Sequence, residues 1–326
     1  MALTLSLVVP ATDGPPTLRG CLAAVARAAD GPDEVIAVTD PTVGSAAAAR
    51  NDGAARANGD VLVFVDADVE VHPDAFSRIR AAFDADPALT AVLGSYDDRP
   101  RAHGTVSSFR NLLHHHVHQG AAGEAETFWT GVGAVRRDAF LAVGGFDQER
   151  YPNPSIEDIE LGHRLAASGG RLWLDPAIQG THLKRWTLSS MVRTDFGRRG
   201  VPWVALQVRS RRFADTLNLG WRHRISALLC LALPVVALLG PPAALPGATA
   251  ALIALNRAFY GLLLRQLGIF RGVAGMTLHW VHHLTAVAAV PVGVLVAARS
   301  PGTRPGPLLR VVDRPGTRAE PEAVRP

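Results

Sequence analysis

Hydrophobic runs alternate with amphipathic segments through the first half of the chain. Helix-start signals open the segments between the runs, among them Pro16 in a first turn and Ser45 ahead of an Ala-rich stretch ending at Asn58. Short links between strands and helices predict an α/β domain with an open, mostly parallel sheet and right-handed crossovers. The predicted strands are Leu3 to Val9, Glu34 to Thr39, Asp60 to Val65, Ala88 to Tyr96 and Arg171 to Leu174.

Two carboxylates follow the most strongly apolar of these runs. Residues 61–65 are all apolar, and four of them are β-branched or aromatic, so we expect a strand buried on both faces. In an extended chain Asp66 and Asp68 would share one face, with Ala67 opposite. Two oxygen ligands at the carboxyl edge of a parallel strand suit a divalent cation that also holds a diphosphate. An ordinary acidic turn after a strand is the alternative interpretation.

Apolar segments return in the C-terminal third of the chain. Ile225 to Leu239 and Met276 to Ala298 carry no formal charge and approach the ~20 residues that a spanning helix needs. Between them Ala248 to Leu264 is interrupted by Asn256 and Arg257, which fits a re-entrant, interfacial or third spanning segment. Basic clusters flank the region on both sides, and the positive-inside rule then favours an even number of crossings.

Composition adds a charge asymmetry to this pattern. The chain of 326 residues has room for about two domains, and its net charge is +4. Between Lys184 and Arg224 ten Lys or Arg stand against two Asp, which indicates an anionic surface as neighbour. Two separated cysteines predict no disulfide framework, and the start of the chain shows no signal-peptide pattern, so we expect the soluble part in the cytosol.

These features predict four regions. Residues 1–188 form the catalytic domain, 189–224 basic amphipathic helices at a membrane surface, 225–298 two or three transmembrane helices, and 299–326 a disordered basic tail. Nucleic acid is the competing partner for the basic segment, but the apolar segments that follow argue against it. We therefore expect an integral inner or plasma membrane protein with no nucleic-acid partner.

The first domain carries, in order, Pro10, Asp40, the run Ala49-Arg50-Asn51-Asp52-Gly53, Gly59-Asp60 and Asp66-Ala67-Asp68. Taken together, these motifs resemble a family 2 glycosyltransferase of the GT-A fold. The resemblance implies a nucleotide-sugar donor, with a UDP-sugar favoured, and Mn²⁺ or Mg²⁺ held by Asp68 and Asp66. Many members carry two acidic residues after the second strand, where this chain has Thr39-Asp40, so the identity of the nucleotide stays open. The residues that the resemblance assigns to the nucleotide-sugar are Pro10, Asp40, Arg50, Asp60, Asp66 and Ala67.

A later acidic pair has two interpretations. Ser155 followed by Asp158 fits a capping box at a helix start. The family pattern instead implies that a Glu-Asp pair here supplies the general base, because an inverting transfer needs a carboxylate to take the acceptor proton. We predict Asp158 as base and Glu157 as a neighbour that orients the acceptor, although one carboxylate could serve both purposes.

Two further segments resemble pocket residues of the family. Trp129 and Gly131 would line the sugar and acceptor pocket, although a packing role for Trp129 is equally open. Processive synthases of the family carry Gln-x-x-Arg-Trp where this chain has His182, Arg185 and Trp186. His182 is either a third metal ligand or a structural histidine. Arg185, with Lys184, either neutralises the leaving diphosphate or begins the basic surface, and Trp186 is assigned to the acceptor pocket.

Histidines also cluster in the predicted helix Thr105 to Gln119. Of the four between positions 114 and 118, only His114 and His118 have the i, i+4 spacing that brings side chains together. We interpret the pair as a polar wall of the acceptor side in preference to a metal site.

The expected function is a metal-dependent, inverting, hexosyltransferase-type glycosyltransferase with a cytosolic catalytic domain. Its acceptor would be a hydroxyl or phosphate, lipid-linked or glycan, at the membrane face. A processive polysaccharide synthase is one alternative, disfavoured by the missing Gln and the shortage of spanning helices. A catalytically silent membrane scaffold of the same fold is another, disfavoured by the intact Asp66/Asp68 and Glu157/Asp158 pairs.

Overall fold

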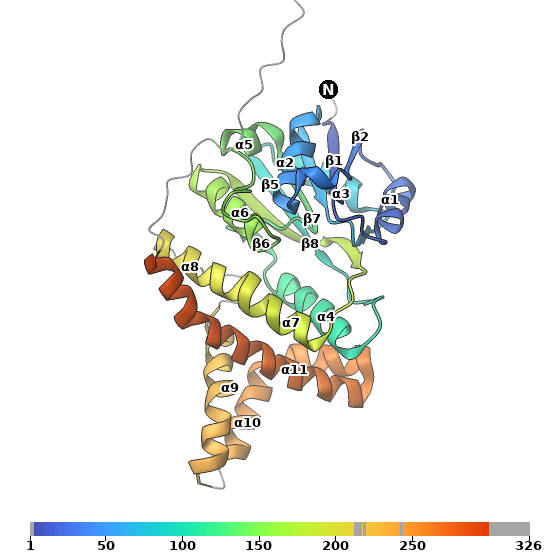
Figure 1. Cartoon of the computed structure of the whole chain (residues 1–326). Helices are drawn as coiled ribbons and strands as arrows, with labels where there is room; N and C mark the ends of the chain where they lie inside the picture. The colour runs from blue at the N-terminus through green and yellow to red at the C-terminus, as the bar shows by residue number, and fades with distance from the viewer. Residues whose placement is uncertain (1–2, 212–216, 218–219, 242–243, 300–326) are drawn as a thin grey trace, which may run out of the picture.

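An α/β domain forms the upper part of the molecule in Figure 1, and a group of helices lies beneath it. The computed structural model describes residues 3–211, 217, 220–241 and 244–299, so the predicted basic tail lies outside the described residues except for Arg299. Residues 225–298, predicted as the transmembrane region, correspond to the last three of the lower helices.

The sheet has eight strands, and its order along the connected path is β2-β1-β3-β7-β5-β8-β4, with β6 beside β8. Strands β1, β2 and β3 are parallel to one another, as are β5 and β8. β7 runs antiparallel between β3 and β5, which the alternation of strands and helices did not predict. The bounds are β1 Leu5–Pro10, β2 Glu34–Val38, β3 Val61–Val65, β4 Val69–Val71, β5 Leu89–Tyr96, β6 Gly123–Ala125, β7 Val132–Arg136 and β8 Arg171–His182.

Strand β3 lies in the core, as its sequence predicts. Its five residues have no solvent exposure. Val61, Val63 and Val65 pack with α1 and α3 on one face, and Leu62 and Phe64 pack with α2, α5 and α6 on the other. The bounds of these helices are α1 Leu18–Arg27, α2 Ala46–Arg56, α3 Ala75–Ala85, α5 Arg137–Ala142 and α6 Glu157–Ala167.

In the part of the chain that the structure describes, seven helical segments lie below the α/β domain, as Figure 1 shows for the labelled helices. A short π-helix, η2, continues α7 without a break into α8, and α11 is kinked at Gly268, where φ is 74°. Helices α9 and α11 are long and apolar enough to cross a membrane. The bounds are α4 Thr105–Gly120, α7 Leu188–Arg193, η2 Thr194–Gly200, α8 Val201–Ser210, α9 Trp221–Leu239, α10 Ala244–Leu255 and α11 Arg257–Arg299.

Candidate active site

The carboxyl ends of β1, β2 and β3 meet at one edge of the sheet, where such folds bind their ligands. Pro10 is the last residue of β1, and Asp40 lies two residues past β2. Asp40 accepts hydrogen bonds from the backbone and hydroxyl of Thr42, so the loop after β2 has a defined shape at this edge. Asp66 follows β3 directly.

Asp60 lies at the opposite end of β3 from Asp66, so its predicted place near the nucleotide has no support in this position. It precedes β3, whereas Asp66 follows that strand. Its carboxylate accepts hydrogen bonds from the backbone and side chain of Thr4, just before β1. Five residues of extended strand rise about 17 Å, which separates Asp60 from the ligand-binding edge.

Asp66 and Asp68 lie in a tight turn and not on one face of an extended strand. The Asp66 carbonyl accepts a hydrogen bond from the Val69 backbone N–H at 3.0 Å. The two side chains then meet different partners. Asp66 Oδ1 accepts from Arg50 Nη2 at 2.7 Å, and Asp68 Oδ2 lies 3.6 Å from His182 Nε2. The turn therefore gives the two carboxylates different partners, although the sequence predicted both as ligands of one metal ion.

His182 reaches Asp68 because β4 pairs with the end of β8. Val69 is the register partner of His182, and the Leu183 N–H donates to the Asp68 carbonyl at 2.8 Å. The His182 ring also stacks on Tyr96, with ring centroids 4.2 Å apart and an interplanar angle of 9°. Tyr96 is the last residue of β5, and sequence reasoning missed it although strand ends were the signal used elsewhere.

The charge around Asp68 keeps it ionised. Burial alone would raise the pKa of this carboxyl, but its contact with His182 and the nearby Lys184 ammonium lower it below the usual value. Lys184 Nζ lies 5.0 Å above the Trp186 ring, which holds this cation beside the site. The Asp68 oxygens are therefore acceptors for a cation at neutral pH.

Asp68 and His182 have the donor atoms that Mn²⁺ and Mg²⁺ accept. The part of the chain that the structure describes contains no group of three His, Cys, Asp or Glu side chains close enough to hold a metal by itself. A metal that binds a nucleotide diphosphate needs only one or two protein ligands, because phosphate oxygens and water supply the rest. The carboxylate–imidazole pair fits such a metal, whereas Asp66 is engaged by Arg50.

Arg50 joins the two acidic motifs. Its guanidinium donates to Asp66 and, through Nη1, to Glu157 Oε1 at 3.0 Å. The Arg50 and Glu157 side chains are each only 6% exposed, so this ion pair is removed from water. The sequence assigned Arg50 to the nucleotide, but the structure shows a buried link between the turn after β3 and the start of α6.

The start of α6 does not form the capping box that its sequence allows. Ile156 is the N-cap residue and makes no side-chain cap hydrogen bond. The Ser155 hydroxyl instead donates to the Arg198 carbonyl of η2 at 2.6 Å, and the Ser155 N–H donates to Glu157 Oε2. Capping by Ser155 therefore does not account for the acidic pair.

Asp158 has a carboxyl group suited to exchange a proton near neutral pH. Burial raises its pKa most, and the neighbouring Glu157 carboxylate adds to this, so that the pKa reaches about 7 despite the opposing charge of Arg50. A general base works best when its pKa lies near the working pH. A general base is often one of two adjacent carboxyl groups whose surroundings differ, because the difference separates their pKa values.

An aromatic wall runs from His182 to Trp129. We use this name for Tyr96, His114, His118, Trp129 and His182, whose neighbouring ring centroids lie 4.0 to 5.1 Å apart. Burial lowers the pKa of His114 well below its usual value and that of His118 to about 4, so both rings are neutral. The predicted His114/His118 pair is therefore part of a largely uncharged surface.

Trp129 and Gly131 depend on each other. A Cβ added to Gly131 would lie 2.1 Å from the Trp129 ring, so the indole packs directly over this glycine. Trp129 remains partly exposed. Both the packing role and the pocket role of Trp129 are compatible with this position.

Arg185 and Trp186 lie in different surroundings. Arg185 is exposed, whereas Trp186 is partly buried against α4: its backbone N–H donates to the Ser107 hydroxyl, and its ring lies 5.2 Å from the Arg110 guanidinium. Trp186 thus packs between the α/β domain and the lower helices. Its predicted contact with the acceptor has no direct support in this position.

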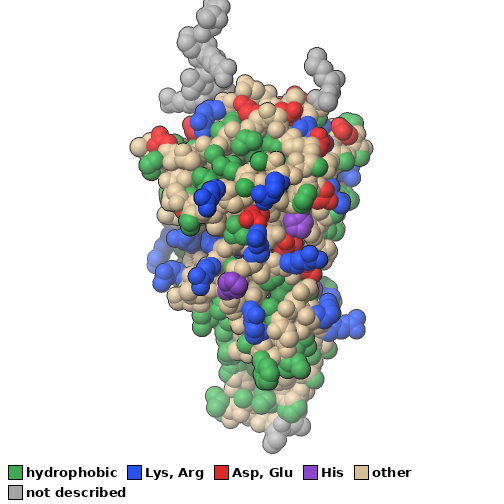
Figure 2. All heavy atoms as spheres, turned by 90° about the vertical axis from the view of Figure 1, so that its right-hand side faces the viewer, with side chains coloured by type: hydrophobic (Ala, Val, Ile, Leu, Met, Phe, Trp, Pro, Cys, Tyr) green, Lys and Arg blue, Asp and Glu red, His purple; other side chains and the backbone are tan. Residues whose placement is uncertain are grey.

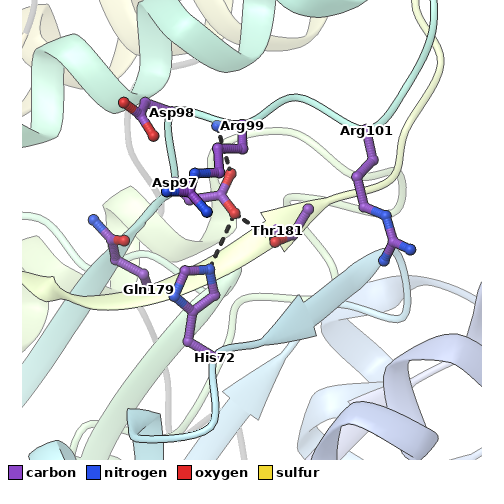
Figure 3. Close-up of a pocket in the computed structure, with 7 residues that line it drawn as sticks. All are labelled: His72, Asp97, Asp98, Arg99, Arg101, Gln179 and Thr181. Atoms are coloured by element: carbon purple, nitrogen blue, oxygen red, sulfur yellow. Dashed lines mark hydrogen bonds and ion pairs between the residues drawn. The ribbon is translucent and has the colours of Figure 1, made fainter.

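A separate polar pocket of about 430 Å³ opens beside β4 and β8 (Figure 3). Asp97 lies at its centre and accepts hydrogen bonds from Thr181, His72 and the Arg99 backbone (Figure 3). Thr181 precedes His182 on β8, and successive strand residues point to opposite faces, so this pocket and the Asp68–His182 pair lie on different sides of the strand. The lining residues are His72, Asp97, Asp98, Arg99, Arg101, Gln179 and Thr181.

Comparison with known proteins identifies relatives of the α/β domain. Residues 42–143 match the model of glycosyl transferase family 2. No protein among those with curated functions matches the sequence. The family match includes α2, the turn after β3 and Trp129, and it ends before the acidic pair of α6.

Solved structures give a similar picture. A mannosyltransferase from Pyrobaculum calidifontis, in complex with GDP-Man and Mn²⁺, is 18% identical, with a TM-score of 0.50 over 91% of this chain and 88% of its own. GalNAc-T7 with UDP, GalNAc and Mn²⁺ is 17% identical, with a TM-score of 0.42 over 57% of this chain and 44% of its own. Glucosyl-3-phosphoglycerate synthase from Mycobacterium tuberculosis, with Mn²⁺, UDP-glucose and phosphoglyceric acid, is 17% identical. Its TM-score is 0.40, over 59% of this chain and 75% of its own.

Proposed function

We propose that this chain, whose residues 42–143 match glycosyl transferase family 2 and whose fold is similar to that of a mannosyltransferase, transfers a hexosyl group from a nucleotide-diphosphate sugar to a membrane-linked acceptor. Donor binding is assigned to the edge formed by Pro10, the Asp40 loop and the Asp66–Asp68 turn. A UDP-sugar is the favoured donor, and the GDP-Man complex of the similar mannosyltransferase makes a GDP-sugar the first alternative.

The observation that supports this proposal most strongly is the link made by Arg50. One buried guanidinium holds the carboxylate turn at the donor edge and the acidic start of α6. A transferase must keep its donor site and its base in register, since reacting groups must be positioned before the reaction. A scaffold protein has no need for a base whose pKa lies near 7 beside such a link.

Asp158 is proposed as the base that takes the proton of an acceptor hydroxyl. The acceptor oxygen then forms the new bond to the anomeric carbon while the bond to the leaving diphosphate breaks, and direct attack from the opposite side inverts the configuration. Glu157, paired with Arg50, is proposed to orient the acceptor beside Asp158. An acceptor phosphate would reach the site already ionised and would not need this proton transfer.

Mn²⁺ or Mg²⁺ is proposed as the cofactor. When bound, the metal would neutralise the charge of the diphosphate. Asp68 and His182 would hold it, and the ammonium of Lys184 adds positive charge beside Asp68. Three similar solved structures contain Mn²⁺, which motivates testing this metal first.

The acceptor is proposed to be lipid-linked and to approach along the aromatic wall. Sugar rings pack well on aromatic faces, and Trp129 is the partly exposed member beside Gly131. The apolar helices beneath the α/β domain would hold the site close to a membrane (Figure 1). We propose an inner or plasma membrane location with the catalytic domain in the cytosol.

Detergent-purified protein tested on a panel of UDP-, GDP- and dTDP-sugars addresses this function. Nucleotide release should occur with one donor, in the presence of Mn²⁺ or Mg²⁺, and should stop with chelator. With a lipid-phosphate or glycolipid acceptor, nuclear magnetic resonance of the product should show that the anomeric configuration of the donor sugar is inverted. The product should contain one added sugar per acceptor, as expected for a single transfer. Absence of donor binding across the panel would overturn the proposal.

A further inference from the structure

Helices α9 and α10 form a hairpin that points away from the α/β domain (Figure 1). From Ile225 to Asn256 the sequence contains no Lys, Arg, Asp, Glu or His. At the end of α9, Leu238 and Leu239 are 83% and 84% exposed. An uncharged hairpin with such an apolar end is unlike a water-exposed surface, and it needs a covering.

The polar groups of the hairpin lie at its other end. Arg222 Nη2 donates to the Leu255 carbonyl at 2.6 Å, and Asn256 Nδ2 donates to Ser226 Oγ at 2.8 Å. We call these four residues the polar neck. The neck joins the first turn of α9 to the last turn of α10, so polar groups mark one end of the hairpin and apolar groups the other.

The uncharged part of the hairpin is short for a membrane crossing, although α9 with its basic first turn has the 19 residues of a candidate spanning helix. The uncharged part of α9, residues 225–239, is about 22 Å long, and the 12 residues of α10 are about 18 Å long. The hydrocarbon core of a bilayer is about 30 Å thick. A hairpin that starts at one head-group layer therefore ends within the hydrocarbon, and its uncharged tip is suited to that position.

Helix α11 has the length of a spanning helix but lies along other helices. Its contacts continue from Arg271, which donates to Ser108 of α4, to Val296, whose carbonyl accepts from Arg209 of α8. Between these ends, a Cβ on Gly293 would lie 2.6 Å from the Val204 side chain. The residues from 271 to 296 rise about 37 Å, and this length lies beneath α4, α7, η2 and α8 (Figure 1).

A buried ion pair fixes the middle of α11 to this support. Asp195 of η2 is 3.1 Å from Arg110 of α4 and 2.8 Å from His282 of α11. η2 in turn is bonded to the active-site loop through Arg198 and Ser155. A helix fixed along the underside of the catalytic domain in this way cannot also cross a bilayer perpendicular to it.

The outer side of α11 is apolar at both ends. Phe270 is 91% exposed and Ile269 is 73% exposed near the kink, and Leu295 is 54% exposed near the other end. Figure 2 shows hydrophobic side chains over the lower, narrow part of the molecule and a band of Lys and Arg above it. Apolar groups below cationic groups match the order of acyl chains and anionic head groups in one leaflet.

From these observations we infer that the chain is monotopic: the α9–α10 hairpin enters one leaflet and returns, and α11 lies flat at the head-group level on the same side. The partner of this surface is an anionic phospholipid bilayer. The inference deepens the proposed function by stating how the catalytic site is held at a membrane, and it differs from the two or three crossings that the sequence predicts.

Cysteine labelling of the full chain in spheroplasts tests the inference. A parent with Cys21→Ala and Cys230→Ala, the only two cysteines of the sequence, is the unlabelled reference in which each new cysteine is placed. Asp84→Cys on the exposed side of α3 reports the catalytic domain, and Leu239→Cys reports the hairpin tip. An impermeant maleimide should label Asp84→Cys only after lysis, and Leu239→Cys only after denaturation in SDS. Labelling of Leu239→Cys in intact spheroplasts would show a crossing and overturn the inference.

Depth measurements exclude the remaining explanations. A fluorophore on Leu239→Cys, in phosphatidylethanolamine–phosphatidylglycerol vesicles, should be quenched most by lipids with a spin label deep in the acyl chain. Fluorophores on Phe270→Cys and Leu295→Cys should both be quenched most by shallow labels. If no spin-labelled lipid quenches the fluorophore at residue 239, a second copy of the chain covers the tip, and the inference is overturned. Quenching that places residues 270 and 295 of α11 in different leaflets would overturn it as well. Neither measurement requires transferase activity, so failure here is distinguishable from failure of the proposed function.

Discussion

Replacing Arg50 by Met tests the link between the two acidic motifs. Methionine keeps most of the volume of the arginine stem but removes the guanidinium that both Asp66 and Glu157 contact. The Glu157 side chain, 6% exposed, then keeps a charge without its partner. Removing one member of a buried ion pair costs about 3–5 kcal/mol. We expect a loss of this size in the free energy of unfolding of Arg50→Met.

The matched control lies two turns along the same helix. Arg56 pairs with Asp52 at 2.9 Å, but both side chains are more than 40% exposed. Exposed pairs of this kind contribute less than about 1 kcal/mol. Arg56→Met should therefore unfold at nearly the denaturant concentration of the parent, while Arg50→Met unfolds clearly earlier.

Activity provides the second measurement on the same variants. Arg50 lowers the pKa of Asp158 in the native protein. Its removal should move the pH at which transfer reaches half its maximum upwards, whereas Arg56→Met should leave it unchanged. Equal stability of the two variants, together with an unmoved pH profile of Arg50→Met, would refute the role assigned to Arg50.

Three further predictions follow from single contacts. Transfer to a hydroxyl acceptor should rise about tenfold between pH 6 and pH 8. With a pKa of about 7, Asp158 is ionised in about a tenth of the molecules at pH 6 and in about nine tenths at pH 8. A rate that does not change over this range would exclude Asp158 as the base. Gly131→Ala should lower the free energy of unfolding by about 1–3 kcal/mol and slow transfer to the acceptor, since the new Cβ would lie 2.1 Å from the Trp129 ring. Gly120→Ala is the control: there is open space around Gly120, so both stability and transfer should stay unchanged. Asp195→Asn should destabilise by about 3–5 kcal/mol, because it leaves Arg110 without its charge partner; an unchanged melting temperature would contradict this.

The pH dependence of stability should oppose that of activity at Asp158. The folded pKa of about 7 lies above the usual value of 3.8, so the folded protein binds the proton more tightly than the unfolded chain. The contribution of Asp158 to stability is therefore fully present below about pH 4 and is lost as the pH rises through about 7. Asparagine cannot ionise, so Asp158→Asn does not lose stability as the pH rises through 7. The free energy of unfolding of this variant should therefore be higher than that of the parent at pH 8.

Local pattern was sufficient to predict five of the eight strands, namely β1, β2, β3, β5 and the first part of β8. The apolar run before Asp66 has one physical outcome, a strand buried on both faces, and β3 has that environment. The prediction for Asp60 was made by resemblance, whereas the direction of β3 puts Asp60 and Asp66 at opposite ends of the strand.

Partners far apart in the chain could not be predicted in the same way. Arg50 and Glu157 are separated by 107 positions, and nothing local in either segment indicates that they meet. Ser155 had the spacing of a cap, but a carbonyl of η2 offered its hydroxyl another acceptor. For α11 a signal was present: Gly272, Gly275 and His279 recur at helical spacing and are buried, which is typical of a packed helix face.

The central claim is that the Asp66–Asp68 turn holds the donor and that Asp158 performs the proton transfer. Calorimetric titration of nucleoside diphosphate with Mn²⁺ into the parent, Asp68→Asn and Asp158→Asn, beside transfer assays on the same preparations, separates these two roles. We predict that Asp68→Asn loses metal-dependent binding, and that Asp158→Asn binds like the parent but transfers at least about a hundredfold more slowly. Unimpaired transfer by Asp158→Asn, or unchanged metal-dependent binding by Asp68→Asn, would contradict the account.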